Sequence, residues 1–188
     1  MGEKGQQTKK MIRMEAKKLF AEKGFSQVTM KDICEATGLS RGGLYRHYES
    51  TAEIFEEIFL ELSNDNESLI DQRIGAGIPA MDILKEEMQI MKEEMMNPQD
   101  SLSLPIYEYA NMVDSKLFED LNEKGMQKWQ RLMKYGVQRG EFIEEHTSEA
   151  ITMILYAYQG IRMWSRVIAL SPQVVQDYEN SIIQLIKK

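Results

Sequence analysis

Apolar side chains recur every three or four residues along almost the whole chain, which is the period of an amphipathic α-helix. The first such stripe predicts a helix over residues 7–24, ending near Gly24. No stretch alternates apolar and polar residues in the way that a half-buried strand does. The pattern therefore predicts an all-α fold of about nine helices.

Residues 29–48 predict two short helices joined by a tight turn. Thr29 is placed to cap the first helix, and Asp32 follows three residues later, which resembles a capping box. Gly38 supplies the permissive backbone that the turn requires, and Ser40 is placed to cap the second helix. The stretch is thus a helix-turn-helix.

The second short helix has an apolar side and a polar side. Leu44 and Tyr48 lie four residues apart on one face. The residues left to point elsewhere are polar, basic or aromatic: Arg41, Gly42, Tyr45 and Arg46. Such a helix suits the major groove of DNA, where donors and flat rings reach base edges and phosphates. From spacing alone, a helical corner in an ordinary bundle explains the pattern equally well.

The remaining apolar stripes divide residues 51–188 into six longer helices. Ser50 and Glu53 form an S-x-x-E capping box that starts the first of them, and the stretch GAGIP ends it. The later helices are expected at 80–96, at 102–112, from a cap at Ser115 to the turn at 139–142, at 148–169, and from Ser171 and Pro172 to the end of the chain.

The predicted helix over 148–169 is apolar on nearly every side, so it must be buried all round. A membrane span is disfavoured, because Arg162 and Arg166 would each cost about 2.5–3.5 kcal/mol near a bilayer centre. A second copy of the chain is the better cover, with the last two helices forming a four-helix interface about a two-fold axis. The expected dimer interface residues are Ile151, Leu155, Tyr158, Val175, Tyr178, Ile182 and Ile186.

From the composition we expect a cytoplasmic protein. No uninterrupted apolar span reaches the ~20 residues that a membrane helix needs, and the first ten residues are polar. The single cysteine, Cys34, excludes an internal disulfide and is expected to be packed and inert.

The net charge of −7 is unevenly distributed along the chain. Residues 1–50 hold ten Lys/Arg against six Asp/Glu, and residues 51–188 hold thirteen against twenty-four. A basic head on an acidic body turns the head toward a polyanion. The basic residues lie beside the helix-turn-helix, which favours DNA binding over chance.

The pattern T-x-x-D-I-x-x-x-x-G-x-S-x-G-x-L-Y-x-H-Y over residues 29–48 closely resembles the DNA-binding signature of the TetR/AcrR family of one-component transcriptional regulators. The resemblance implies a three-helix DNA-binding domain over residues 1–50 and a helical domain for ligand binding and dimerisation over residues 51–188. It also implies that the last two helices form the dimer interface.

The resemblance further implies which residues contact the operator: Thr29, Lys31, Ser40, Arg41, Gly42, Gly43, Tyr45, Arg46, His47 and Tyr48. Lys9, Lys10 and Arg13 are placed to reach phosphates, although a solvated helix face explains the lysines equally well. Two positions depart from the family. Gly43 stands where many relatives carry Thr, Ser or Ala, and Thr51 stands where relatives usually carry a phosphate-binding Lys. We expect one phosphate contact fewer per subunit.

Fourteen methionines indicate an adaptable apolar body. The expected ligand-binding residues are Met88, Met91, Met95, Tyr107, Met112, Trp129, Met133, Tyr156, Gln159, Arg162 and Met163. For any single methionine, an ordinary core position is the simpler explanation. Arg162 needs an acceptor, for which Glu108, Asp114 and a ligand carboxylate are the alternatives.

The sequence carries no pattern of an enzyme. Neither His47 nor His146 follows a Glu by three residues, so the Glu-x-x-His pairs of di-metal bundles are absent. No phosphate loop, nucleophile elbow or Cys/His cluster occurs, and we expect no cofactor or metal.

We therefore expect a ligand-responsive regulator, most readily a repressor. Its expected partners are double-stranded operator DNA, a small apolar or amphipathic effector and a second copy of itself, without a membrane. The alternative is a helical interaction or ligand-carrier protein that has kept the DNA-binding head as a relic.

Overall fold

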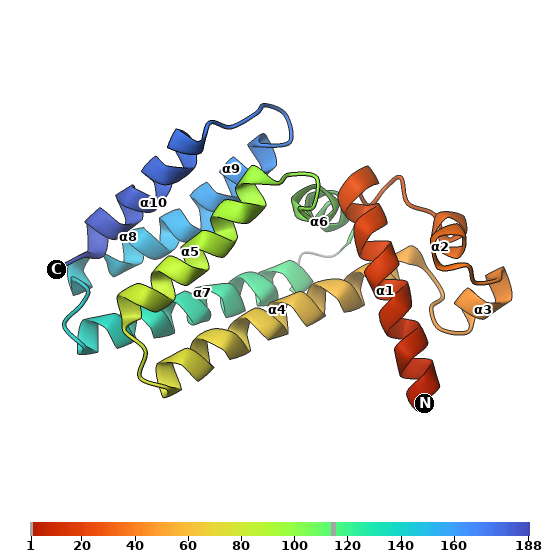
Figure 1. Cartoon of the computed structure of the whole chain (residues 1–188), viewed down its shortest axis with the longest axis horizontal. Coiled ribbons are helices and arrows are strands. Elements are labelled where there is room, and N and C mark those ends of the chain that lie inside the picture. The colour runs from red at the N-terminus through yellow and green to blue at the C-terminus, as the bar shows by residue number, and fades with distance from the viewer. Residues whose placement is uncertain (1, 114–115) are drawn as a thin grey trace. The chain divides into compact units, whose positions relative to one another are not determined.

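A computed structural model of the chain describes residues 2–113 and 116–188, and within them only the backbone of residues 63–68 (Figure 1). The elements are α1 (Glu3–Lys23), α2 (Met30–Thr37), α3 (Arg41–Tyr45), α4 (Thr51–Gly75), α5 (Ala80–Met96), α6 (Ser103–Ala110), α7 (Lys116–Gln138), a 3₁₀ turn (Glu144–His146), α8 (Thr147–Thr152), a π-helix (Met153–Ala157), α9 (Tyr158–Trp164) and α10 (Pro172–Ile186). Across the described residues, an isolated bridge between Phe142 and Lys187 is the sole β-type pairing. The all-α prediction is confirmed.

The chain forms two compact units that each contain segments from two places in the sequence. One unit comprises Met1–Asn64 and Leu102–Val113, and the other comprises Asp65–Ser101 and Asp114–Lys188. The first holds α1, α2, α3, the start of α4 and the whole of α6. The second holds the rest of α4 together with α5 and α7–α10.

The first unit is held together by four aromatic rings from different elements. Phe20 of α1 lies 5.1 Å, centroid to centroid, from Phe55 of α4. Phe25 follows α1 and lies 4.7 Å from Tyr109 of α6, which in turn lies 5.2 Å from Phe55. Large rings at these distances bury much apolar surface and favour edge-to-face contact. We call Phe20, Phe25, Phe55 and Tyr109 the aromatic cluster.

The core of the second unit is built from the predicted apolar stripes of α5, α7, α8 and α10, whose helices run side by side (Figure 1). One buried carboxylate interrupts it. Glu87 accepts a bond from Lys128 Nζ at 2.9 Å and pairs with Arg73 Nη1 at 3.4 Å. A charge removed from water requires such partners, so this pair of cations explains how Glu87 is tolerated.

The helix predicted as continuous over 148–169 is interrupted and shorter. Residues Met153–Ala157 form a π-helix, and α9 ends at Trp164. The wider turn frees backbone carbonyls, and the Tyr178 hydroxyl donates to those of Met153 and Ile154 at 3.3 and 3.5 Å.

Among the described residues, no helix is long and apolar enough to cross a bilayer.

Most helix boundaries agree with the sequence within a few residues. The first helix begins earlier than predicted, at Glu3, and the expected helix over 102–112 is shorter, at Ser103–Ala110. The cap expected at Ser115 lies outside the described residues. Pro172 opens α10 as predicted, but the Ser171 side chain makes no capping hydrogen bond.

The cap of α4 differs in detail from the predicted S-x-x-E box. The Glu53 amide donates to Ser50 Oγ at 3.2 Å, as expected. The Glu53 carboxylate accepts from the amide of Glu49 at 2.7 Å, one residue before the predicted donor. Both bonds still satisfy amides at the helix N-terminus.

A substitution in α7 tests how tightly the second unit is packed. A Cβ added at Gly136 would lie 2.1 Å from the ring of Phe142, which is buried. Because neither atom has room to move, Gly136→Ala should destabilise the fold by about 1–3 kcal/mol, despite the better helix propensity of Ala. Thermal unfolding should show a melting temperature several degrees lower.

Gly125→Ala in the same helix is the matched control. Its Cβ would meet Leu155 at 3.6 Å, an ordinary contact. Ala should there be neutral or stabilising by up to about 1 kcal/mol. Equal melting temperatures for the two variants would contradict the close contact between Gly136 and Phe142.

Candidate DNA-binding surface and ligand site

The helix-turn-helix forms as predicted, and α3 is its exposed second helix. Ser40 Oγ accepts from the Gly43 amide at 3.1 Å and so caps α3. Leu44 points inward and is fully buried. Because α3 is only five residues long, this cap and this single anchor fix which side chains face outward.

The predicted capping box of α2 is confirmed. Thr29 Oγ1 accepts from the Asp32 amide at 3.2 Å, and the Thr29 amide donates to the Asp32 carboxylate at 2.9 Å. The Thr29 side-chain and backbone bonds, with a further bond from Lys23, hold the pKa of Asp32 well below its usual range. The Thr29 hydroxyl is thus engaged in the cap of α2.

The outward face of α3 carries the basic and aromatic side chains that the sequence placed there. Arg41, Tyr45 and Arg46 are exposed, and the Arg41 guanidinium lies 5.6 Å from the centre of the Tyr45 ring. This is cation–π distance, so the two side chains form one surface. A Cβ added at Gly42 would meet nothing, whereas at Gly43 it would lie 3.2 Å from Ser40 Oγ.

Two residues of the expected DNA-contact set lie further inside. Tyr48 is 1% exposed, and its hydroxyl accepts from Arg13 Nη1 at 3.0 Å. Burial raises the pKa of Tyr48 to about 12, so the phenol stays protonated at neutral pH. His47 is half-buried, and its Nδ1 has no hydrogen-bond partner among the described residues.

Lys9 and Arg13 of α1, two of the residues expected to reach phosphates, bind carboxylates of α4. Lys9 Nζ lies 3.1 Å from Glu57, and Arg13 binds both Glu57 and Glu61 at 2.7 Å. The side chains of both cations are largely buried, and their charge is neutralised within the unit. Lys10 and Lys31 remain exposed.

The charge of the first compact unit differs from that of residues 1–50. Its ten Lys/Arg meet eleven Asp/Glu: six in residues 1–50, four in 51–64, and Glu108. The acids of α4 therefore cancel the excess that the sequence division indicated. The unit as a whole is not positively charged. Its exposed basic side chains include Arg41 and Arg46 of α3 and Lys10, Lys17 and Lys18 of α1.

The expected ligand-binding residues differ in burial and belong to both compact units. Five are buried in the core of the second unit: Met88, Met91, Met95, Trp129 and Met133. Met163 is half-buried, whereas Tyr156 and Gln159 are exposed. Tyr107 and Met112 are exposed and belong to the first unit.

Arg162 is buried and has a partner that the sequence did not identify. Its Nη1 donates to Glu94 of α5 at 2.8 Å and to the Tyr158 hydroxyl at 3.1 Å. Of the acceptors expected from the sequence, Glu108 instead accepts from the Ser26 amide, and Asp114 lies outside the described residues. Several acidic residues stood at similar helical positions, so no sequence signal distinguished Glu94.

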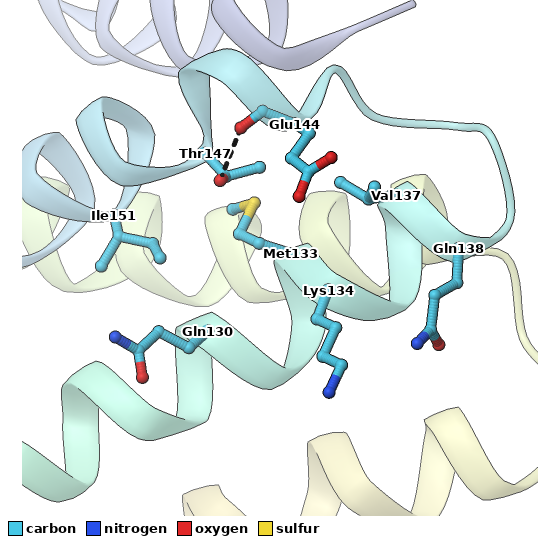
Figure 2. Close-up of a pocket in the computed structure, with 8 residues that line it drawn as sticks. All are labelled: Gln130, Met133, Lys134, Val137, Gln138, Glu144, Thr147 and Ile151. Carbon is cyan, nitrogen blue, oxygen red and sulfur yellow. Dashed lines mark hydrogen bonds between the residues drawn. The ribbon is translucent and has the colours of Figure 1, made fainter.

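A cavity of about 310 Å³ lies beside α7, the 3₁₀ turn and α8 (Figure 2). This is near the lower limit for small-molecule pockets. Lys134 and Gln138 extend away from its centre, and Thr147 Oγ1 donates to the Glu144 carbonyl at 2.9 Å (Figure 2). Of the expected ligand residues only Met133 takes part; the rest of the lining is Gln130, Lys134, Val137, Gln138, Glu144, Thr147 and Ile151. Polar residues on an exposed helix face gave no sequence signal of a cavity.

The stripe expected at the dimer interface packs against its own chain. Ile151, Tyr158, Val175, Tyr178, Ile182 and Ile186 are buried in the second unit's core, and Leu155 is half-buried against it. The apolar side chains that stay exposed on α9, on α10 and around them are different: Tyr156, Trp164, Val167, Ile168 and Val174.

Comparison with known proteins identifies the helix-turn-helix. Residues 12–58 match the family described as bacterial regulatory proteins, tetR family. An uncharacterised HTH-type transcriptional regulator of Bacillus subtilis, YfiR, is 28% identical over 68% of this chain. The HTH-type transcriptional repressor KstR2 of Rhodococcus jostii is 24% identical over 66% of this chain. The matched regions span 64% and 62% of these two relatives.

Solved structures extend the likeness to the whole fold. A TetR-family transcriptional regulator from Agrobacterium tumefaciens superposes with a TM-score of 0.77 at 9% identity, covering 98% of this chain and 100% of its own. These relatives and fold neighbours are transcriptional regulators and not enzymes. The helix-turn-helix geometry, the family match over it and the shared fold lead to one conclusion: residues 12–58 belong to a domain of the tetR family type, and the chain has the fold of the TetR-family regulators with which it was compared.

Proposed function

We propose that the protein is a repressor that binds a palindromic operator as a homodimer and is released by a small apolar or amphipathic ligand. The observation that carries the proposal is the face of α3, where Arg41 and Tyr45 form one exposed surface while Leu44 anchors the helix from behind. A relative at 24% identity is named as a repressor, which supports the direction of regulation.

In the proposed complex, two side chains of α3 contact the bases. Arg41 offers a guanidinium that can donate two bonds to guanine, and Tyr45 offers a ring for apolar contact with the groove. Gly42 and Gly43 let the backbone approach the DNA closely. Because the hydroxyls of Thr29 and Ser40 serve as caps, these residues position the helices, and Tyr48 supports α3 from inside.

Phosphate contacts should be fewer than the charge of α1 suggests. Lys9 and Arg13 are paired with Glu57 and Glu61, and position 51 is a threonine. Each phosphate contact contributes roughly 0.9 to the slope of log binding constant against log salt. A shallow salt dependence is therefore part of the proposal.

The proposed dimer uses the exposed apolar side chains around α9 and not the buried stripe of α10. Trp164 is 57% exposed, and Val167 and Val174 are exposed nearby in sequence. Large apolar residues left in water on neighbouring elements mark a protein–protein interface. A two-fold dimer through this face would present two copies of α3, which need a separation of about 34–36 Å to enter successive major grooves.

Ligand response can act through α6. Glu108 accepts from the Ser26 amide at 2.9 Å and abuts Gly24, and the Tyr109 hydroxyl bonds Glu56 of α4. The residues on either side of the 102–113 segment belong to the second unit. A ligand that favours one arrangement of those flanking residues would change the position of Glu108 and with it the hydrogen bond to the Ser26 amide, beside the turn into α2.

The second candidate function is a helical carrier or interaction protein with a relic head. It is favoured by the near-neutral charge of the first unit, where eleven acids meet ten bases. A carrier would bind the same ligands but would not retain DNA. Duplex binding thus separates the two candidates.

Removing either exposed side chain of the α3 surface should weaken operator binding. Arg41→Ala and Tyr45→Ala should each cost about 1–3 kcal/mol, roughly tenfold to a hundredfold in affinity, because base contacts are lost. Fluorescence anisotropy with a duplex of the promoter region flanking the gene measures this. Lys18→Ala, which removes an exposed α1 charge paired with Glu15, is the control and should change affinity little.

Absence of duplex retention at low salt would contradict the DNA-binding proposal and favour the carrier. If Arg41→Ala reduced operator affinity no more than Lys18→Ala does, α3 would not be the helix that contacts the bases.

Placing a charge on the α9 face should dissociate the dimer. Trp164→Asp replaces a half-exposed aromatic ring, so the subunit should still fold while the interface acquires an unpaired buried charge. Equilibrium sedimentation should then show monomer where the unchanged protein is a dimer. Ile90→Asp, on an exposed apolar position of α5, should leave the dimer intact. Dissociation by Ile90→Asp alone would place the interface on α5.

A further inference from the structure

Arg162 is a buried cation with an unused hydrogen-bond donor. The residue is 9% exposed, and its Nε has no hydrogen-bond partner among the described residues. A buried donor left unpaired is costly, and a charged one more so. The guanidinium is built to bind a carboxylate through two parallel bonds, yet both of its recorded bonds leave from Nη1. Its second edge is available for an acceptor.

Glu94, the carboxylate that Arg162 does bind, is loosely placed. Its side chain is 43% exposed, and a single oxygen, Oε2, accepts both from Arg162 and from the Tyr158 hydroxyl. Burial raises the pKa of Tyr158, so this hydroxyl remains a donor. A half-exposed glutamate can swing into water at little cost, whereas Arg162 and Tyr158 are fixed in the core. Glu94 is the exchangeable member of the group.

The residues that follow Arg162 hold its backbone in place. Arg166 lies one turn further along and donates to the Pro98 carbonyl at 2.6 Å. Ser165 Oγ donates to the Arg162 carbonyl at 2.8 Å and so fixes the backbone behind the guanidinium. The position of the Arg162 guanidinium is therefore fixed from its backbone side.

The helix that carries Glu94 also carries a buried methionine stripe. Met88, Met91 and Met95 lie on α5, and from first to last they span about 10 Å along the helix axis at 1.5 Å per residue. Methionine side chains re-pack around apolar shapes more readily than branched ones. A short alkyl chain entering beside Glu94 would thus meet an adaptable apolar surface of matching length.

We propose that Arg162 and Tyr158 bind the carboxylate of an amphipathic ligand, which displaces Glu94 and lays its apolar tail along the α5 methionines. Glu94 then acts as an internal substitute for the ligand headgroup and holds the site closed until an external carboxylate competes. This inference rests on the proposed function, for which it names the chemical class of the effector: an anion with an aliphatic tail, in preference to a neutral or cationic molecule.

The direct test is isothermal calorimetry of the full chain at pH 7.5 with decanoate and, separately, decanol. The two probes share a tail and differ in charge. Decanoate should bind more tightly than decanol. Glu94→Gln removes the competing charge and keeps the shape, so decanoate affinity should rise about tenfold, the value of one charge-assisted hydrogen bond, while decanol affinity stays unchanged. Glu94 is half-exposed, so this variant should fold.

A second variant tests the cation itself. Arg162→Gln should abolish the preference for decanoate over decanol, whereas Arg131→Gln, which removes an arginine paired with Asp71, should preserve it. Equal binding of the two probes to the unchanged protein would overturn the inference. So would a Glu94→Gln variant whose decanoate affinity is unchanged or lower, because Glu94 would then be a structural ion pair and not a competitor.

Duplex binding, measured on the same preparations, distinguishes failure of the anion site from failure of the proposed regulator. Duplex binding without any preference for decanoate overturns the anion site and leaves the proposed regulator intact. A decanoate preference governed by Glu94 and Arg162 without duplex binding overturns the regulator and upholds the anion site.

Discussion

A five-residue helix cannot stabilise itself, and this constraint governs the DNA-binding part of the molecule. Fixing the backbone of the first helical turn loses more conformational entropy than its hydrogen bonds offset in free energy. The short helix α3 therefore forms only because the surrounding residues pack against it. Leu44 anchors it from beneath, and Tyr48 closes its end against Arg13. The outward direction of Arg41 and Tyr45 follows from these buried contacts. The exposed surface of α3 therefore depends on the residues that are buried behind it.

The same packing depends on a segment far away in the sequence. Tyr109 completes the aromatic cluster, and Glu108 binds the Ser26 amide between α1 and α2. Both belong to α6, although the residues before 102 and after 113 are part of the other compact unit. The proposed ligand response uses this continuity of the chain. In that proposal, ligand binding shifts the segments that continue into α6, and the aromatic cluster and the Ser26 contact shift with them.

Features determined by neighbouring residues could be predicted from the sequence. The Thr29–Asp32 box, the Ser40 cap and nearly all helix ranges depend on local bonds and periodicity. Choices of tertiary partner could not. The α10 stripe containing Ile182 was interpreted as an interface, but periodicity cannot tell whether an apolar face meets its own chain or a second copy. Likewise, the sequence does not show which acidic residue pairs with which basic one. The pairs of Arg162 with Glu94 and of Lys9 with Glu57 were therefore not predicted.

The central claim is that α3 and its few phosphate contacts bind operator DNA, and a salt titration tests it most directly. The affinity of the full chain for its promoter duplex should be measured by anisotropy over a range of salt, alongside Thr51→Lys. The account predicts salt-dependent binding that is shallow for the unchanged protein and steeper by about 0.9 in log–log slope per subunit for the lysine variant. Binding that is absent at low salt, or that has the same slope in both proteins, would contradict it.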